Sequence, residues 1–277
     1  MVRMRTLFGW TPYPPAVFNK TGIPQLMRGL PEKFIDFNKC LSRRFDALLP
    51  EPFRVDGHKH FREEFAPPQI PDGALVYEVG GGKHPLHSEE EKTRRGLRVI
   101  GFDIDERELA RAPRGAYDAT IRADITEYRG RENADVVICQ AMLEHVADTP
   151  AAFAGLASIL KKGGVALLFA PSRNAVFARV NLLIPERLKR ILIRLLYPEL
   201  ADQSGFPGRY HRCTLSEFEE MARGQGFAVV QKKTYYFSEY FSFFAPFHVL
   251  WRLWLWVFYL LSRERGAETF SMALRKL

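Results

Sequence analysis

The stretch V-Y-E-V-G-G-G-K-H-P, residues 76–85, decides the fold of this 277-residue chain. A short apolar run passes through Glu78 and breaks into three consecutive glycines, Gly80, Gly81 and Gly82. This pattern predicts a buried parallel strand that ends at the ligand-binding edge of a doubly wound α/β sheet. Glycine allows left-handed backbone angles and lets a ligand approach without meeting a Cβ atom. The Glu78 carboxylate favours a cationic or hydroxylated ligand over a phosphate, although a purely structural turn would use the same residues.

A second predicted strand, residues 97–102, ends in an acidic residue, Asp103, which lies 23 positions after Gly80. In nucleotide-binding α/β units an acid at this distance accepts hydrogen bonds from ribose hydroxyls. Dinucleotides and S-adenosylmethionine both use this layout. The dinucleotide fingerprint requires a third glycine three positions after the second, and here Pro85 follows Gly82 at that distance. The sequence therefore gives little support to a pyrophosphate-binding turn.

Five blocks of sequence, in this order, resemble those of the class I S-adenosylmethionine-dependent methyltransferases and are most similar to the type 11 group. The blocks begin at Glu78, Val99, Ala123, Ala134 and Leu160, within residues 73–172. The resemblance implies an α/β, Rossmann-like, doubly wound sheet of seven strands with the last strand antiparallel. The sequence Lys83-His84-Pro85 departs from the small residue that many members have after the glycines.

The resemblance also implies which residues bind the cofactor S-adenosyl-L-methionine. Glu78, Gly80, Gly81 and Gly82 would line its methionine part. Asp103 would hold the ribose and Ile104 would pack on the adenine. Asp124 would accept from the adenine amine, with Ile125 beside it, and Gln140 would face the methyl group. We expect no metal site, because Cys40, Cys139 and Cys213 lack metal-ligand spacing.

Composition and charge favour one methyltransferase domain with additions. The net charge is +4 over residues 1–66, −3 over 67–172 and +7 over 173–277. We expect a basic, helical N-terminal extension at 1–66 and a methyltransferase domain at 67–277 with helical insertions at 173–213 and 237–266. A basic surface is compatible with nucleic acid or with an anionic membrane. The N-terminus lacks an apolar signal-peptide region, so we expect a cytoplasmic protein.

The periodicity of apolar residues and the positions of glycine and proline predict the individual helices and strands. Strands are expected near 74–79, 97–102, 120–123, 134–139, 164–170, 227–236 and 268–275, and helices near 25–49, 87–95, 105–112, 149–161 and 214–224. Thr214 and Glu217 form a predicted capping box at the start of the last of these helices.

Two apolar stretches in the insertions indicate what surface the protein contacts. Residues 185–197 read as a basic amphipathic helix, which suits either a membrane interface or a lid on its own domain. Residues 241–261 contain 17 apolar residues in 21, interrupted by Pro246, His248 and Arg252. A single crossing would put the last strand on the wrong side of the membrane, so we expect peripheral (monotopic) association. The alternative for this segment is a buried helix or an oligomer contact.

A methyl group on a sulfonium is already activated, so a general base is needed only for a hydroxyl or acidic-carbon acceptor. His145 and His211 are the candidate bases; each can equally be a structural histidine. The favoured function is methyl transfer to a small or lipid-linked acceptor at the membrane surface. The alternatives are an RNA methyltransferase, although the Asp/Asn-Pro-Pro-aromatic signature is absent from the fourth strand, and a non-catalytic cofactor-binding protein.

Overall fold

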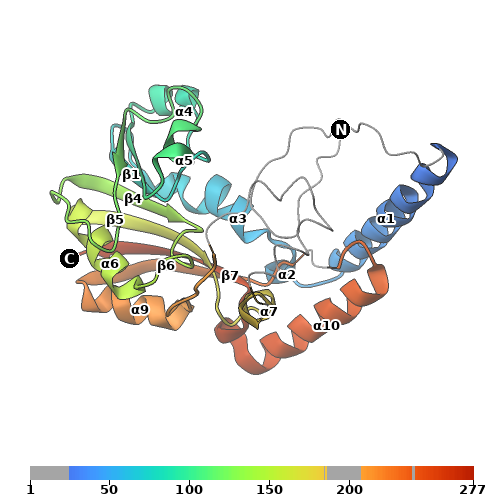
Figure 1. The fold of residues 1–277 in the computed structure, drawn as a ribbon. Coiled ribbons are helices and arrows are strands. Elements are labelled where there is room, and N and C mark those ends of the chain that lie inside the picture. Colours follow the sequence, from blue (N-terminus) through green and yellow to red (C-terminus); the bar gives the residue numbers. More distant parts are fainter. Residues whose placement is uncertain (1–24, 184, 186–206, 239–240) are drawn as a thin grey trace. The chain divides into compact units, whose positions relative to one another are not determined.

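The computed structural model describes residues 25–183, 185, 207–238 and 241–277, which fall into two compact units (Figure 1). Unit 1 comprises residues 1–55 and 236–263, and unit 2 comprises residues 56–235 and 264–277. The predicted amphipathic helix at 185–197 lies outside the described residues except for its first position. The sheet-bearing unit begins at Asp56, and the boundary expected at residue 66 stays a prediction.

Unit 2 is built on a seven-stranded sheet with the order β3-β2-β1-β4-β5-β7-β6. The strands are β1 (Leu75–Val79), β2 (Arg98–Asp103), β3 (Ala119–Arg122), β4 (Ala134–Gln140), β5 (Leu160–Pro171), β6 (Phe227–Tyr235) and β7 (Thr269–Lys276). The strands from β3 to β5 pair in parallel, and β7 pairs antiparallel with both β5 and β6. The α/β, Rossmann-like fold with an antiparallel last strand is therefore confirmed.

The order of the strands reverses at β1, because β2 and β3 lie on one side of it and β4 and β5 on the other. Ligands of doubly wound sheets bind at the carboxyl edge beside such a reversal. Glu78 of β1 pairs with Gly101 of β2 and Ile138 of β4, and Gln140 at the end of β4 pairs with Phe169 of β5. The register thus brings the predicted site residues to one edge.

The described helices of unit 2 are short and connect these strands. They are α3 (Gly57–His60), the π-helical turn η1 (Phe61–Phe65), the 3-10 turn η2 (Pro67–Gln69), α4 (Glu89–Arg94), α5 (Glu106–Ala110), α6 (Thr149–Ile159), α7 (Val176–Leu183) and α9 (Leu215–Gly224), and the 3-10 turn η4 (Arg263–Gly266) precedes β7. The expected helix 149–161 is wrong at its end, because Leu160 pairs with Ala134 and so already belongs to β5.

The predicted capping box at α9 forms, with one difference. The Thr214 hydroxyl accepts from the Glu217 N–H at 3.3 Å, as expected. The Glu217 carboxylate accepts from that same hydroxyl at 2.7 Å, whereas in the usual box it bonds the backbone of the cap residue. Phe218 of α9 then packs edge-on against Phe153 of α6 and Phe270 of β7, each with ring centroids 5.1 Å apart. These three buried rings anchor α6 and α9 on the sheet.

Unit 1 contains α1 (Gln25–Asp46), α2 (Glu51–Arg54) and α10 (Ala245–Ser262). His248 and Arg252 are fully buried on one face of α10, and both bond the Asp46 carboxylate at the end of α1. Asn38 accepts a hydrogen bond from the Ala245 N–H at 2.9 Å. Polar groups therefore join α1 to α10. None of the described helices is long and apolar enough to cross a membrane.

Candidate active site

The glycine turn after β1 is closely covered by neighbouring side chains. Gly80 and Gly82 have φ angles of +74° and +47°, which favour glycine because L side chains are strained there. A Cβ on Gly81 would lie 2.6 Å from the Tyr117 hydroxyl oxygen and 2.7 Å from Cγ of Glu78. Met142, just after β4, occupies the place where Gly80 would carry a Cβ. A larger residue at any of these positions would displace the walls of the turn.

Glu78 is buried beside this turn with only part of its hydrogen-bonding capacity used. Its Oε1 accepts from the Leu86 N–H at 2.7 Å. Within the described part of the chain, its buried Oε2 has no hydrogen-bond partner. Burial raises the pKa of Glu78 to about 7, and the positive charge of Arg62 opposes part of that rise. A buried carboxylate oxygen without a partner favours a ligand that brings a positive charge or a donor.

Arg62 is a site residue that the sequence analysis missed. Its Nη2 donates to the Pro85 carbonyl at 2.7 Å and to the Leu86 carbonyl at 3.2 Å, and its Nη1 donates to Gln140 Oε1 at 3.2 Å. Burial lowers the pKa of Arg62, and Glu78 opposes this. Arg62 therefore ties the loop after the glycines to the end of β4 and places a cation beside Glu78.

Asp103 lies opposite the glycine turn at the end of β2. Its Oδ1 accepts from the Asp105 N–H at 2.9 Å, and its Oδ2 would lie 3.3 Å from a Cβ on Gly82. Burial raises the pKa of Asp103. Ile104 beside it is half exposed, at 51 %. An acidic group and an exposed apolar side chain at this position suit a ribose and an aromatic base.

Tyr117 is a second residue that the sequence analysis missed. Its ring covers Gly101 of β2, where a Cβ would lie 2.6 Å from the ring, and its hydroxyl donates to the Gly82 carbonyl at 3.0 Å. Burial raises the pKa of Tyr117, and the carboxylates of Glu78 and Asp103 raise it further. The neutral hydroxyl therefore holds the glycine turn between the two acids.

Asp124 makes polar contacts in a turn, whereas its neighbour Ile125 is buried. Asp124 Oδ1 accepts from the Thr126 N–H at 2.9 Å and from the Thr126 hydroxyl at 2.7 Å. Ile125 is 4 % exposed and packs in the core against Gly155 of α6. Both of these bonds use Oδ1, so within the described residues the second carboxylate oxygen of Asp124 could accept from a ligand, whereas the side chain of Ile125 belongs to the core. Both ligand roles stay predictions.

Gln140 lies at the end of β4 between two partners. Its Oε1 accepts from Arg62, and its Nε2 contacts Nε2 of His58 from α3. The next residue, Ala141, has a φ angle of +50°, and its N–H donates to the Phe169 carbonyl at 2.8 Å. A non-glycine residue in the left-handed region is strained, and such strain concentrates at functional sites. The positive φ angle of Ala141 turns the chain sharply after Gln140.

The candidate base His145 lies in the turn that follows β4. Its Nδ1 is 3.2 Å from the Pro207 carbonyl, which can only accept, so Nδ1 carries the proton and Nε2 is the basic nitrogen of the neutral ring. Nε2 lies 3.7 Å from Oε1 of Glu144. Glu144 is buried, and burial raises its pKa. The Glu144 carbonyl accepts from the Tyr210 N–H at 2.8 Å, which joins this turn to the segment before α9.

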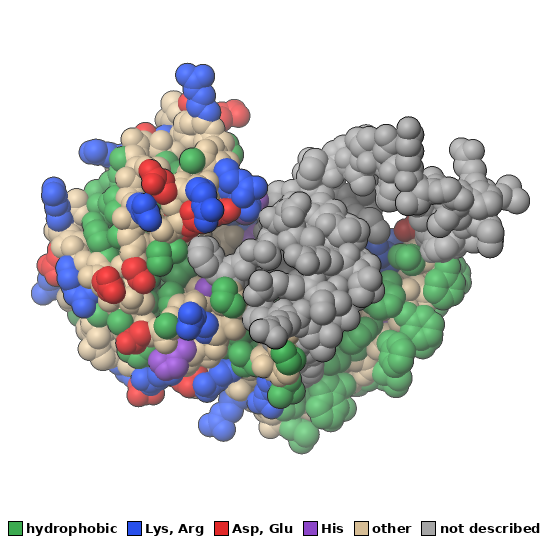
Figure 2. All heavy atoms as spheres, viewed as in Figure 1, with side chains coloured by type: hydrophobic (Ala, Val, Ile, Leu, Met, Phe, Trp, Pro, Cys, Tyr) green, Lys and Arg blue, Asp and Glu red, His purple; other side chains and the backbone are tan. Residues whose placement is uncertain are grey.

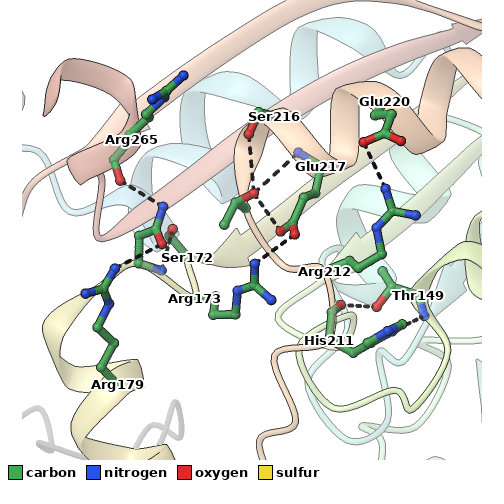
Figure 3. A network of polar contacts seen from close by, with 12 residues as sticks. Thr149, Ser172, Arg173, Arg179, His211, Arg212, Ser216, Glu217, Glu220 and Arg265 are labelled. Atoms are coloured by element: carbon green, nitrogen blue, oxygen red, sulfur yellow. Dashed lines mark hydrogen bonds and ion pairs between the residues drawn. The ribbon is translucent and has the colours of Figure 1, made fainter.

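The second candidate base, His211, belongs to a network around the start of α9 (Figure 3). Its Nδ1 accepts from the Thr149 N–H at 3.4 Å, and its carbonyl accepts from the Thr149 hydroxyl. The next residue, Arg212, pairs with Glu220 at 2.9 Å. These contacts give His211 a structural role at the start of α6, and its catalytic role stays a prediction. In the described residues no group of three or more His, Cys, Asp or Glu could hold a metal ion.

The donors and acceptors at this edge fit S-adenosylmethionine. Arg62 suits its carboxylate, the unpartnered oxygen of Glu78 suits its ammonium, and Asp103 suits its ribose hydroxyls. The three glycines carry no side chain of their own, so Met142, Tyr117 and Glu78 can approach the backbone of the turn closely and form its walls.

Comparisons with known proteins agree with this fit. The profile of a family described as "Methyltransferase domain" matches residues 54–232. The chain is 28% identical over 109 residues to the ubiquinone biosynthesis O-methyltransferase of Aeromonas salmonicida, covering 37% of this chain and 45% of that protein. It is 32% identical over 111 residues to the enzyme of the same name from Leptothrix cholodnii, covering 37% and 46%. The matched segment spans less than half the length of these relatives.

A solved structure of similar fold is that of a candidate S-adenosylmethionine-dependent methyltransferase from Listeria monocytogenes. It superposes with a TM-score of 0.50 at 15% identity and covers 79% of this chain and 99% of that one. At this identity the likeness concerns the fold alone. The family profile, which matches more than half of the chain, shows the family: this chain belongs to the class I S-adenosylmethionine-dependent methyltransferases.

Proposed function

We propose that this chain transfers the methyl group of S-adenosylmethionine to a small or lipid-linked acceptor at a membrane surface. The observation that carries the proposal is the buried carboxylate of Glu78, which keeps one oxygen without a partner in the described structure, next to Arg62 and opposite Asp103. Two acids and one guanidinium around a bare glycine turn match the ammonium, hydroxyl and carboxylate groups of this cofactor.

In this proposal Glu78, Gly80, Gly81 and Gly82 hold the methionine part and Arg62 its carboxylate. Asp103 accepts from the ribose and Ile104 packs on the adenine. Asp124, which is followed by the core residue Ile125, accepts from the adenine amine, and Gln140 faces the methyl group. The bound cofactor supplies an activated methyl group on a positively charged sulfur. The chain itself binds and orients the acceptor, excludes water, and takes up a proton where the acceptor is a hydroxyl.

The relatives and the side chains at the carboxyl edge of the sheet support an acceptor class. The curated relatives are named as O-methyltransferases of ubiquinone biosynthesis. We infer a hydroxyl on a small molecule for this chain as well. Two histidines are the candidates for accepting its proton. His145 has a basic Nε2, and His211 stays a second candidate.

The membrane part of the proposal rests on unit 1, where α10 buries His248 and Arg252 and exposes most of its large apolar residues. His248 and Arg252 are fully buried, whereas Leu250 and Trp254 are 64% and 54% exposed. Apolar side chains gather over the surface of this unit (Figure 2). The exposed ones are Phe34, Phe37, Leu41 and Leu48 from α1 and the loop after it, Phe241 and Phe243, and Phe247, Leu250, Leu253, Trp254, Trp256, Val257, Leu260 and Leu261 from α10.

Exposed apolar surface of this extent marks a membrane or protein contact, and tryptophan favours the membrane interface. Exposed cations of the same unit, Arg43, Arg44 and Arg263, suit anionic headgroups. A peripheral contact with an anionic bilayer would give the enzyme access to an acceptor dissolved in that bilayer.

Two measurements test the proposal. Calorimetry with S-adenosylhomocysteine should give a dissociation constant in the micromolar range, about −8 kcal/mol, and absence of binding would reject the enzyme hypothesis. Transfer of a tritiated methyl group into a cell lysate, separated into lipid, nucleic-acid, protein and small-molecule fractions, should label the lipid or small-molecule fraction. Label confined to RNA or protein would reject the acceptor class while leaving the cofactor assignment intact.

A further inference from the structure

We propose that His58 is the catalytic base of this site, and that Arg62 and Gln140 hold its Nε2 unprotonated so that it can accept the proton of an acceptor hydroxyl. This inference rests on the proposed methyl transfer to oxygen. His58 lies 20 residues before Glu78 and outside every motif that pointed to the site.

The protonation state of His58 follows from a chain of three side chains. Arg62 is a donor only, so the Gln140 oxygen must face it, and at 3.2 Å it does. The Gln140 amide nitrogen therefore faces His58, where it contacts Nε2. An amide N–H donates and cannot accept, so Nε2 must present its lone pair and the ring proton must lie on Nδ1. Reversing the amide would place two donors against each other at Arg62.

His58 is also held firmly at the edge of the sheet. The Asp56 carboxylate accepts from the backbone N–H groups of His58 and Lys59 at 3.0 and 3.2 Å, which caps α3. Gly57 packs so closely that a Cβ there would lie 2.6 Å from the Tyr235 ring. The His58 ring meets Phe169 edge-on, with centroids 5.7 Å apart. A base positioned by packing and by a second layer of hydrogen bonds is what proton transfer requires.

The position of His58 Nε2 suits methyl transfer to an acceptor hydroxyl. Gln140 is the residue expected to face the methyl group, and Phe169 is its partner at the carboxyl end of β5. An acceptor hydroxyl would replace the Gln140 N–H as the donor to Nε2. As the acceptor oxygen bonds to the methyl carbon, its proton passes to Nε2, and the electron pair of the broken S–CH3 bond stays on sulfur, which becomes neutral.

The charged groups around His58 come from several elements. Arg62 of η1 reaches it through Gln140, Glu78 of β1 interacts with Arg62, and on α3 itself His60 bonds Tyr235 of β6 at 2.9 Å. Arg62 reaches the ring through the Gln140 amide, and that contact is what turns the Nε2 lone pair toward Gln140.

The first test needs neither cofactor nor acceptor. Long-range ¹H–¹⁵N spectra of the full chain, with His58 assigned by its loss in His58→Gln, should show an unprotonated Nε2 and a protonated Nδ1 at pH 7.5. In Arg62→Met the amide is free to turn, and the ring should shift toward the Nε2–H form that histidine prefers in water. A protonated Nε2 in the wild-type chain would overturn the proposal.

The second test uses the lysate fraction that the wild-type chain labels. His58→Gln should bind S-adenosylhomocysteine within about twofold of wild type, yet label that fraction at least 100-fold more slowly, in line with the loss of a general base. The exposed neighbour Lys59→Gln serves as the matched control and should label normally. An unchanged rate and pH profile in His58→Gln would overturn the inference alone, whereas failure of the wild-type chain to bind S-adenosylhomocysteine would overturn the proposed function.

Discussion

The Asp46 carboxylate of α1 lies 2.8 Å from Nε of Arg252 on α10, whose side chain is fully buried. Arg252 also donates to the Tyr236 carbonyl at 2.7 Å and to the Phe53 carbonyl, so one guanidinium joins three segments of unit 1. His248, one turn earlier on α10, donates to the same carboxylate at 3.0 Å. These polar groups lie on the buried face of α10 together with Leu255, and most of the other apolar residues of the helix are exposed.

Removing Asp46 should destabilise unit 1. In Asp46→Ala the buried Arg252 loses its counter-ion, and breaking a buried ion pair destabilises a protein by about 3 kcal/mol. Urea unfolding followed by tryptophan fluorescence measures this change, because the α10 segment contains three tryptophans. The exposed residue Asp36 on α1 gives the control Asp36→Ala, which should change the unfolding free energy by less than about 0.5 kcal/mol. Equal effects of the two substitutions would contradict a structural ion pair.

Cofactor binding should strengthen as pH rises, because Glu78 must lose a proton to receive an ammonium group. With a folded-state pKa of about 7, the carboxyl is mostly protonated at pH 6 and mostly ionised at pH 8. Calorimetry with S-adenosylhomocysteine should therefore give a dissociation constant about tenfold lower at pH 8 than at pH 6. Glu78→Gln should bind more weakly and with little pH dependence. A flat wild-type profile would contradict this role.

The same raised pKa predicts how the stability of the unliganded chain varies with pH. Since the folded-state pKa of Glu78 lies above its ordinary value of 4.5, its contribution favours the folded state below about pH 4.5 and is lost as pH rises through 7. Thermal unfolding of wild type and Glu78→Gln between pH 5 and 8 isolates this contribution. The wild-type melting temperature should fall relative to that of the variant as pH rises. A constant difference would show that Glu78 titrates normally.

Asp103→Ala should weaken binding of S-adenosylhomocysteine without unfolding the chain. Hydrogen bonds to a charged group contribute about 1.5 to 3 kcal/mol, so the dissociation constant should rise about tenfold to a hundredfold. The control is Glu106→Ala, because Glu106 begins α5 close by and has an exposed side chain. Calorimetry compares the two variants, and equal affinities would remove Asp103 from the cofactor site.

Charges on the exposed face of α10 should abolish membrane binding. Leu250→Glu and Trp254→Glu each replace an exposed apolar side chain whose burial contributes about 1.5 to 3 kcal/mol. Each should reduce co-sedimentation with anionic phosphatidylserine vesicles at least tenfold and leave S-adenosylhomocysteine binding unchanged. Val230→Glu makes the same type of change at an exposed position of β6. If the wild-type chain stays in the supernatant, α10 would instead be a protein interface.

Much of the fold could be predicted because its signals are local. The apolar run before Gly80 and the acid at Asp103 lie at the ends of strands. There the apolar pattern of the strand and the residue that ends it stand within a few positions of each other in the sequence. The end of α6 was placed incorrectly, because the pairing of Leu160 with Ala134 depends on a strand 26 residues earlier in the chain. The helix or strand preference of the residues around Leu160 carries no information about which distant strand they pair with.

The site could be predicted only in part, for the same reason. Asp103 and Gly82 were expected at one site, and a Cβ on Gly82 would lie 3.3 Å from Oδ2 of Asp103. Arg62 and Tyr117 were missed because neither stands in a motif; each reaches the glycine turn through contacts 20 to 35 residues away in sequence. A basic residue in the segment before the first strand was the available signal for Arg62, but the sequence placed it in an N-terminal extension.

The sequence by itself determined the class of the fold, the glycine turn and the acids that face it. Apolar strand patterns, glycines and carboxylates at strand ends are signals that can be recognised within a few neighbouring residues. Only the tertiary structure decided which face of α10 is buried, since that depends on Asp46 some 200 residues away. It likewise decided that Gln140 stands between Arg62 and His58. The proton on His58 follows from that arrangement, because the donors and acceptors of a hydrogen-bonded chain are fixed only when its members meet in space.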